Sequence, residues 1–238
     1  MLSRSCCNAL SRANSGSGFA TLRAHREQCV SVSSVSTAKQ SIVTLDLEGV
    51  LVPEIWIAVA ERTGIEELRR TTRDEPDYDV LMRGRLQLLN EHHLTMSTIA
   101  EVIGTLAPLD GAREFLDTLR SMTQVLLLSD TFEQFGQPLM RQLGYPTLMC
   151  HRLVVENDRI VDYRLRLADQ KRHSVQALHA LNYRVIAAGD SYNDTAMLAE
   201  ADAGFLFHAP DTIKAQFPQF PAVDEYDELL ALIVDQLT

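Results

Sequence analysis

Strand-like runs and helical patterns alternate along most of this 238-residue chain. A first run of β-branched residues covers 41–45, and later strand-like runs lie at 124–128, 147–152, 153–165, 185–188 and 204–207, with a turn at 156–158. Helical periodicity lies between and after them, at 110–120, 132–143, 170–181 and 226–237. Strands that alternate with helices form a mostly parallel sheet with helices on both faces. The sequence therefore predicts an α/β fold with a Rossmann-like sheet.

Three helical patterns follow one another between residues 53 and 106 with no strand between them. They cover 54–62, 78–92 and 97–106, soon after the first strand. A helical block at this place breaks the alternation of strand and helix, so we expect it to be an insertion. The prediction is a small helical insertion at 53–106 in a Rossmann-like core formed by 41–52 and 107–238.

The first forty residues differ in composition from the rest of the chain. They are rich in Ser, Ala and Thr, and their charged residues are Arg4, Arg12, Arg23, Arg26 and Lys39 against the single acid Glu27. A leader rich in Arg and Ser and poor in acids is typical of an organellar transit peptide. A disordered tail without an address is the alternative. We expect a mitochondrial or plastid location in the first case and a cytoplasmic one in the second.

Charge and cysteine content exclude several classes of protein. The formal net charge is −10 although the leader is basic, and nucleic-acid binding relies on a basic surface that contacts phosphates. No apolar run approaches the roughly 18 residues that span a bilayer. Cys150 is the one cysteine beyond the leader, so neither an internal disulfide nor a CxxC metal site is expected there. The oligomeric state stays open, a homodimer included.

Polar clusters follow three of the predicted strands. They are Asp46-Leu47-Glu48, Ser129-Asp130-Thr131 and Gly189-Asp190-Ser191-Tyr192-Asn193-Asp194. Ligands of open α/β sheets bind at the carboxyl ends of strands, so we expect these side chains to converge if the strands are neighbours. Several close carboxylates stay ionised only if a cation compensates them, and oxygen ligands favour Mg²⁺. The sequence therefore predicts a Mg²⁺ site among Asp46, Glu48, Asp190 and Asp194.

The order of these clusters resembles the haloacid-dehalogenase-like phosphatases over about residues 41–225. The shared motifs are Asp-x-acid after the first strand, Ser after the second, a later Lys, and Gly-Asp-x-x-x-Asp. Each motif is short, but four in order at strand ends are specific. The longer strings 46–54 and 189–194 are similar to the bacterial phosphoserine phosphatases that also transfer phosphate to homoserine.

The resemblance implies a role for each residue of the first and last motifs. Asp46 would be the nucleophile that forms an aspartyl-phosphate. Mg²⁺ would be bound by Asp46, Asp190 and the backbone carbonyl of Glu48, and would neutralise repulsion between nucleophile and substrate. Glu48 would protonate the leaving alkoxide and later deprotonate the acceptor. Most relatives place Asp at this position, and the longer Glu also occurs in the homoserine-transferring group.

Further residues would bind the phosphoryl group. By the resemblance, Ser129 and Lys171 would hold its oxygens, Asp130 and Asn193 would contact the substrate, and Asp194 would support the metal site from behind. Plain alternatives exist for two of them, because a lone Lys near a helix start is usually solvated and Asp130 fits a turn. The histidines outside the leader show no metal spacing, and we interpret each as a surface or packing residue: His92, His93, His151, His173, His179 and His208.

The resemblance also implies that the helical insertion at 53–106 is a cap that closes over the catalytic site and determines specificity. Glu54 would receive the ammonium group of the substrate, Arg85 its carboxylate, and Tyr78 would form a wall of the pocket. Each residue also has an ordinary interpretation. Glu54 is then an acid that stabilises the start of a helix, Arg85 an exposed helix cation, and Tyr78 a packing side chain.

The implied activity is Mg²⁺-dependent hydrolysis of O-phospho-L-serine through an aspartyl-phosphate, with transfer to homoserine as an additional reaction. One alternative is a phosphatase of another small phosphomonoester. The other is a receiver-type signalling module, which also combines a strand-end Asp, Mg²⁺ and a Lys. The helical insertion and the acid at position 48 count against the receiver.

Overall fold

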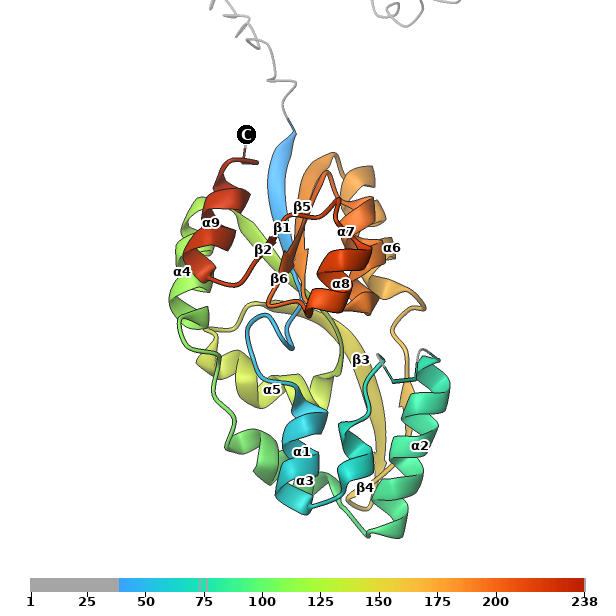
Figure 1. The fold of residues 1–238 in the computed structure, drawn as a ribbon. Helices are drawn as coiled ribbons and strands as arrows, with labels where there is room; N and C mark the ends of the chain where they lie inside the picture. Colours follow the sequence, from blue (N-terminus) through green and yellow to red (C-terminus); the bar gives the residue numbers. More distant parts are fainter. Residues whose placement is uncertain (1–38, 73, 76, 238) are drawn as a thin grey trace, which may run out of the picture. The chain divides into compact units, whose positions relative to one another are not determined.

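The fold is taken from a computed structural model that describes residues 39–72, 74, 75 and 77–237. The described residues form a seven-stranded sheet in the order β4-β3-β2-β1-β5-β6-β7 (Figure 1). Its strands are β1 (Gln40–Leu45), β2 (Gln124–Phe132), β3 (Thr147–Glu156), β4 (Arg159–Arg164), β5 (Tyr183–Gly189), β6 (Ala203–Phe207) and β7 (Ala222–Val223). Neighbouring strands are parallel, apart from the antiparallel pair β3 and β4. The predicted mostly parallel sheet is confirmed, whereas the prediction for the leader falls on residues outside this description, Lys39 and Gln40 excepted.

Helices cover both faces of the sheet, as predicted (Figure 1). On one face lie α4 (Ala112–Met122), α5 (Glu133–Gln142) and α9 (Tyr226–Val234), and on the other α6 (Gln170–Ala180), α7 (Thr195–Glu200) and α8 (Asp211–Gln216). Alternate side chains of β1 point to opposite faces, so Val43 and Leu45 join one apolar cluster and Ile42 the other. Among the described residues, no helix is long and apolar enough to cross a membrane.

The segment between β1 and α4 is helical, as predicted. It contains α1 (Ile55–Thr63), the short 3₁₀ helix η1 (Glu66–Arg69), α2 (Tyr78–Glu91) and α3 (Met96–Gly104). A single turn such as η1 carries too little periodicity to be recognised in a sequence. Apolar side chains of this segment belong to the same cluster as α4, α5 and α9, and Trp56 of α1 meets Phe135 of α5 with ring centroids 5.4 Å apart. The proposed cap boundaries at 53 and 106 stay a prediction.

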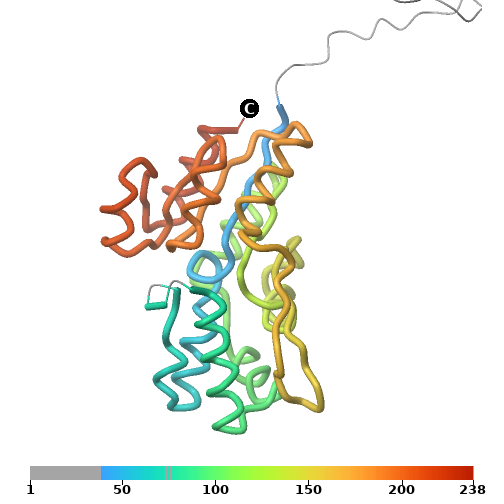
Figure 2. The backbone as a smooth tube through the Cα atoms, turned by 90° about the vertical axis from the view of Figure 1, so that its right-hand side faces the viewer, coloured from blue at the N-terminus to red at the C-terminus, as the bar shows by residue number. Residues whose placement is uncertain are grey.

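A long hairpin formed by β3 and β4 runs beside the cap helices (Figure 2). The turn predicted at 156–158 is confirmed, whereas the predicted division of the first strand at 152 and 153 is wrong, because β3 continues to Glu156. The chain reverses at Asn157 and Asp158, which both have positive φ (48° and 65°), as a tight hairpin turn requires. Asp158 Oδ1 accepts hydrogen bonds from the backbone N–H (2.9 Å) and the hydroxyl (2.8 Å) of Ser97, which tie the turn to α3.

Strand β2 is longer than predicted and ends at Phe132 rather than at Leu128. Its pairing with β3 shifts in register between these two residues. A polar Ser-Asp-Thr sequence is typical of a strand end, but here it continues the strand through an irregular stretch. Ser129, Asp130 and Thr131 therefore still lie at the carboxyl end of the parallel sheet, beside the end of β1.

Candidate active site

A cavity of about 80 Å³ lies between the carboxyl ends of β1, β2 and β5 and the cap helices α1 and α2. These three strands are neighbours in the order β2-β1-β5, which is why their polar ends meet. Nine residues singled out in the sequence line the cavity: Asp46, Glu48, Glu54, Tyr78, Arg85, Ser129, Asp130, Asp190 and Asn193. Two others, Lys171 and Asp194, are buried directly behind Asp46.

Three buried carboxylates surround one buried ammonium group. Asp46, Asp190 and Asp194 each offer an oxygen, and these oxygens all lie within 4.8 Å of one another. Lys171 Nζ lies 3.0 Å from Asp46 Oδ2 and 2.7 Å from Asp194 Oδ1. Burial acts to lower the pKa of Lys171, but the two carboxylates outweigh it and raise that pKa well above its usual value. Lys171 is therefore a fixed cation, not the solvated side chain of the plain alternative.

The cluster of three carboxylates fits a hard divalent cation. Burial and the nearby Asp194 carboxylate raise the pKa of Asp46 well above its ordinary range, and one ammonium group does not balance three carboxylates. Asp46 and Asp190 would offer oxygen ligands, as Mg²⁺ prefers, whereas both oxygens of Asp194 are engaged by Lys171 and by backbone N–H groups. Gly49, with φ +77°, gives Asp190 the space it occupies, because a Cβ there would lie 2.4 Å from Asp190 Oδ2.

Glu48 has surroundings different from those of Asp46. Its Oε2 accepts a hydrogen bond of 2.9 Å from the backbone N–H of Ile55, at the start of α1, and its carboxylate is outside the three-carboxylate group found among the described residues. Burial and then the neighbouring Glu54 raise the pKa of Glu48 to about 7. At neutral pH this side chain can both give and take a proton. Metal binding by its backbone carbonyl stays a prediction.

Hydrogen bonds from backbone N–H groups to the Asp194 side chain fix the loop after β5. Asp194 Oδ2 accepts from the backbone N–H groups of Asp190 (3.0 Å) and Ser191 (3.1 Å). A Cβ at Gly189 would lie 2.3 Å from Asp194 Cγ, so the carboxylate packs directly on the backbone. Asp194 thus holds both this loop and Lys171, and its support of a metal site stays a prediction.

Arg85 reaches the cavity from the cap as a buried cation, which excludes the alternative of an exposed helix residue. Its guanidinium carbon lies 4.6 Å from the centre of the Trp56 ring, and its Nη2 donates to the Arg70 carbonyl oxygen at 2.7 Å. Burial lowers the pKa of Arg85 to about 10, so it stays charged at neutral pH. Its Nε has no hydrogen-bond partner among the described residues. A buried donor without a partner is costly, so this nitrogen fits a ligand acceptor.

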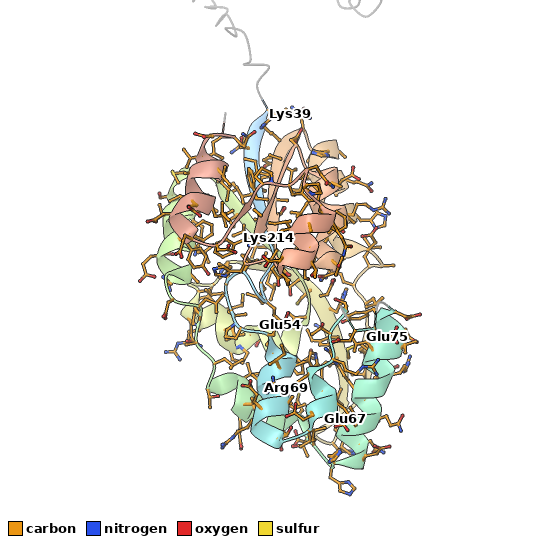
Figure 3. The ribbon with its side chains drawn as sticks, in the orientation of Figure 1. Lys39, Glu54, Glu67, Arg69, Glu75 and Lys214 are labelled. Atoms are coloured by element: carbon orange, nitrogen blue, oxygen red, sulfur yellow. The ribbon has the colours of Figure 1, made fainter. Side chains whose placement is uncertain are left out.

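Glu54 and Tyr78 complete the cap side of the cavity. Glu54 lies just before α1, between the sheet and the cap helices (Figure 3). The Tyr78 hydroxyl donates to the Asp130 carbonyl oxygen at 2.9 Å, so α2 is attached to the end of β2. Tyr78 is therefore more than a packing residue.

The structure adds residues that the sequence did not indicate. Trp56 and Thr131 line the cavity, and Thr131 is buried. His151 and Gln170 are buried and contact Asp130. Thr131 lies inside a recognised motif, but nothing in the sequence spacing relates position 56, 151 or 170 to the site, because these contacts depend on the tertiary fold.

The fold and the site define the class of protein. The sequence matches the family of haloacid dehalogenase-like hydrolases over residues 40–202, and the chain belongs to this family. It is 64% identical to a phosphoserine phosphatase of Pseudomonas syringae pv. tomato, over 83% of this chain and 84% of that protein. It is also 64% identical to phosphoserine phosphatase ThrH of Pseudomonas aeruginosa, over 79% of this chain and 92% of that protein.

Solved structures show the same fold. The crystal structure of phosphoserine phosphatase from T. onnurineus superposes with a TM-score of 0.65 at 25% identity, over 85% of this chain and 98% of that one. A phospho-aspartyl intermediate analogue of phosphoserine phosphatase superposes with a TM-score of 0.68 at 19% identity, over 84% of this chain and all of that one. At 19% identity the second similarity shows the fold alone.

Proposed function

We propose that this protein is a Mg²⁺-dependent phosphatase that hydrolyses O-phospho-L-serine through an aspartyl-phosphate on Asp46. The observation that carries the proposal is one cavity with two chemically distinct ends. At the end of the cavity formed by the sheet, Asp46 lies close to the buried carboxylates of Asp190 and Asp194. At the end formed by the cap lie Arg85 and Glu54. The 64% identity to two phosphoserine phosphatases supports the same substrate.

Each charged group of phosphoserine has a complementary side chain. The carboxylate matches Arg85, whose buried Nε offers an unused donor. The ammonium group matches Glu54 at the start of α1. The phosphate matches Ser129 at the end of β2 and Lys171 behind Asp46. A phosphate ester without an amino-acid head would contact only the phosphate-binding residues, Ser129 and Lys171.

The first chemical step transfers the phosphoryl group to the enzyme. A carboxylate oxygen of Asp46 attacks phosphorus, and the bond between phosphorus and the serine Oγ breaks. The carboxyl group of Glu48 gives its proton to the leaving serine oxygen. Mg²⁺, when bound by Asp46, Asp190 and the Glu48 carbonyl, would neutralise negative charge around the phosphate.

The second step releases phosphate, restores the carboxylate of Asp46 and returns Glu48 to its protonated form. The oxygen of a water molecule attacks phosphorus, the bond to Asp46 breaks, and Glu48 takes the proton of the water. If the hydroxyl of homoserine replaces water, the product is O-phosphohomoserine. We include this transfer in the proposal because Glu48 is one methylene longer than Asp and belongs to a string similar to the homoserine-transferring phosphatases.

Phosphate release from phosphoserine by the purified full-length protein tests the proposal. We expect release that requires Mg²⁺, stops with EDTA, returns when Mg²⁺ is restored, and disappears in Asp46→Asn, which controls for contaminating phosphatases. Faster turnover of a phosphomonoester without an amino-acid head would favour the alternative substrate class. No release from any phosphomonoester, with a stable phosphoprotein instead, would overturn the hydrolase assignment.

Homoserine transfer needs its own measurement. The reaction is run with phosphoserine and Mg²⁺, with and without homoserine, and followed by ³¹P NMR. We expect an O-phosphohomoserine signal that grows with homoserine concentration while inorganic phosphate falls. Inorganic phosphate as the sole product at saturating homoserine would restrict the protein to hydrolysis.

A further inference from the structure

We propose that His151, which lies outside the four motifs, is a positioning residue that orients Asp130 and, through Asp130, the Asn193 carboxamide in the catalytic loop. The inference deepens the proposed phosphatase function and rests on it. His151 belongs to β3 and is not among the described residues that line the catalytic cavity, so it acts through other residues.

Hydrogen bonds assign the proton on the His151 ring. The side chain is only 4% exposed. Its Nδ1 lies 3.1 Å from the backbone nitrogen of Arg166 and accepts that N–H, which places the ring proton on Nε2. Nε2, which carries the proton, lies 3.4 Å from Asp130 Oδ1. The rings of Tyr78 and Phe132 pack around it, with centroids 6.0 and 6.4 Å away.

Asp130 is held as a fixed anion. Besides His151, Gln170 Nε2 contacts Oδ1 at 3.2 Å, and Asn193 Nδ2 donates to Oδ2 at 2.9 Å. Burial disfavours the charge, but Lys171 and the neighbouring polar side chains of His151, Asn193 and Gln170 outweigh it and hold the pKa of Asp130 well below its ordinary value. Both carboxylate oxygens are used, so Asp130 is suited to orient neighbours rather than to exchange protons.

The orientation of Asp130 determines that of Asn193. Because the carboxylate accepts only, the amide nitrogen of Asn193 must face it, and the amide oxygen is left for the Ser191 hydroxyl, which donates to it. Asn193 lies between Asp190 and Asp194 in the loop and lines the catalytic cavity. A change at His151 therefore reaches the phosphate end of the cavity through two side-chain contacts.

Two substitutions separate this role from packing. In His151→Asn the shorter amide can still accept the Arg166 N–H but cannot reach Asp130, whereas the longer amide in His151→Gln reaches Asp130 with an N–H. We expect kcat for phosphoserine to fall about ten-fold in His151→Asn, the low end for outer partners of a site, and to recover at least half-way on a logarithmic scale in His151→Gln. His92→Phe, at the exposed end of α2, is the surface control and should leave kcat unchanged.

A double-mutant cycle with Asn193→Ala provides the decisive readout. Asp130 lies between His151 and Asn193 and contacts both, so we expect the double variant to be no slower than the slower single variant. Multiplying effects, or equal losses in His151→Asn and His151→Gln, would overturn the proposal. If His151→Asn does not fold by circular dichroism, the cycle is run with His151→Gln and read by the same criterion.

Failure of the substrate assignment is distinguishable from failure of this proposal. All variants are also measured with p-nitrophenyl phosphate, which lacks the amino-acid head. A wild-type protein that hydrolyses only this ester would refute the phosphoserine assignment, and the cycle would still test His151 on that substrate. A wild-type protein that hydrolyses neither would refute both.

Discussion

Asp46 and Glu48 are two residues apart, yet their carboxylates have separate surroundings. Asp46 lies beside Lys171 and two other carboxylates, where a bound cation would keep it ionised. Glu48 accepts a hydrogen bond from the backbone N–H of Ile55, and burial and the neighbouring Glu54 raise its pKa to about 7. Different surroundings of two close carboxylates are what separate a nucleophile from a proton donor.

Glu48→Gln tests this division of roles. Glutamine keeps an oxygen for the Ile55 N–H but cannot transfer a proton, so we expect kcat for phosphoserine to fall about 10²- to 10⁴-fold. p-Nitrophenolate leaves without a proton, so stopped-flow absorbance should show a burst of about one p-nitrophenolate per enzyme, followed by slow turnover. Loss of the burst together with the steady-state rate would contradict the assignment of Glu48 as acid and base.

Arg85→Ala tests the carboxylate site in the cap. We expect KM for phosphoserine to rise at least about ten-fold, since a lost charge-assisted hydrogen bond costs roughly 1.5–3 kcal/mol. KM for p-nitrophenyl phosphate should change little. Arg83→Ala, an exposed residue on the same helix with an ion pair to Asp162, is the matched control and should leave both constants unchanged. Equal KM increases for both substrates in Arg85→Ala would refute the site.

At the scale of elements, the sequence predicted which strands carry active-site residues at their carboxyl ends. β-branched runs that end in Asp46 and Gly189 placed β1 and β5 correctly. The sequence could not predict that β2 continues through Ser129 to Phe132, because this stretch depends on pairing with β3. Nor could it relate His151 to Asp130, since that contact needs two strands aligned by the sheet. Local sequence patterns were enough to predict the elements and the motif residues. The extension of β2 and the contact of His151 with Asp130 depend on tertiary contacts, which local patterns do not contain.

The loop between β1 and α1 depends on a glycine. Gly49 has φ +77°, and a Cβ there would lie 2.4 Å from Asp190 Oδ2. We expect Gly49→Ala to displace Asp190, to raise the Mg²⁺ concentration needed for half-maximal activity, and to lower kcat. Mg²⁺ titration of phosphate release measures both effects. An unchanged Mg²⁺ dependence would show that Asp190 does not contribute to metal binding.

Gly84→Ala is the control for this substitution. Gly84 lies inside α2, and an added Cβ would have no atom within 4 Å among the described residues. Alanine in an exposed helix interior stabilises by about 0.8–1 kcal/mol relative to glycine. The variant should therefore keep its Mg²⁺ dependence and unfold at a slightly higher temperature.

At the scale of the molecule, one apolar cluster joins the cap to one face of the sheet. Ile55, Met82 and Ile99 of the cap belong to it together with Leu45 of β1 and Phe135 of α5. A cap that shares its core with the sheet cannot unfold without exposing that face to water. This continuity links the cap side of the site, including Arg85, to the stability of the catalytic core.

The only tryptophan of the chain makes this continuity measurable. Trp56 of α1 packs against Phe135 of α5, so its fluorescence reports on the contact between cap and core. In urea we expect fluorescence and far-UV circular dichroism to give coincident transitions. Phe135→Ala should move both curves together by about 3–5 kcal/mol, and Leu181→Ala, 69% exposed, by at most about 0.5 kcal/mol. A fluorescence transition that precedes the dichroism transition would show that the cap unfolds as a separate unit.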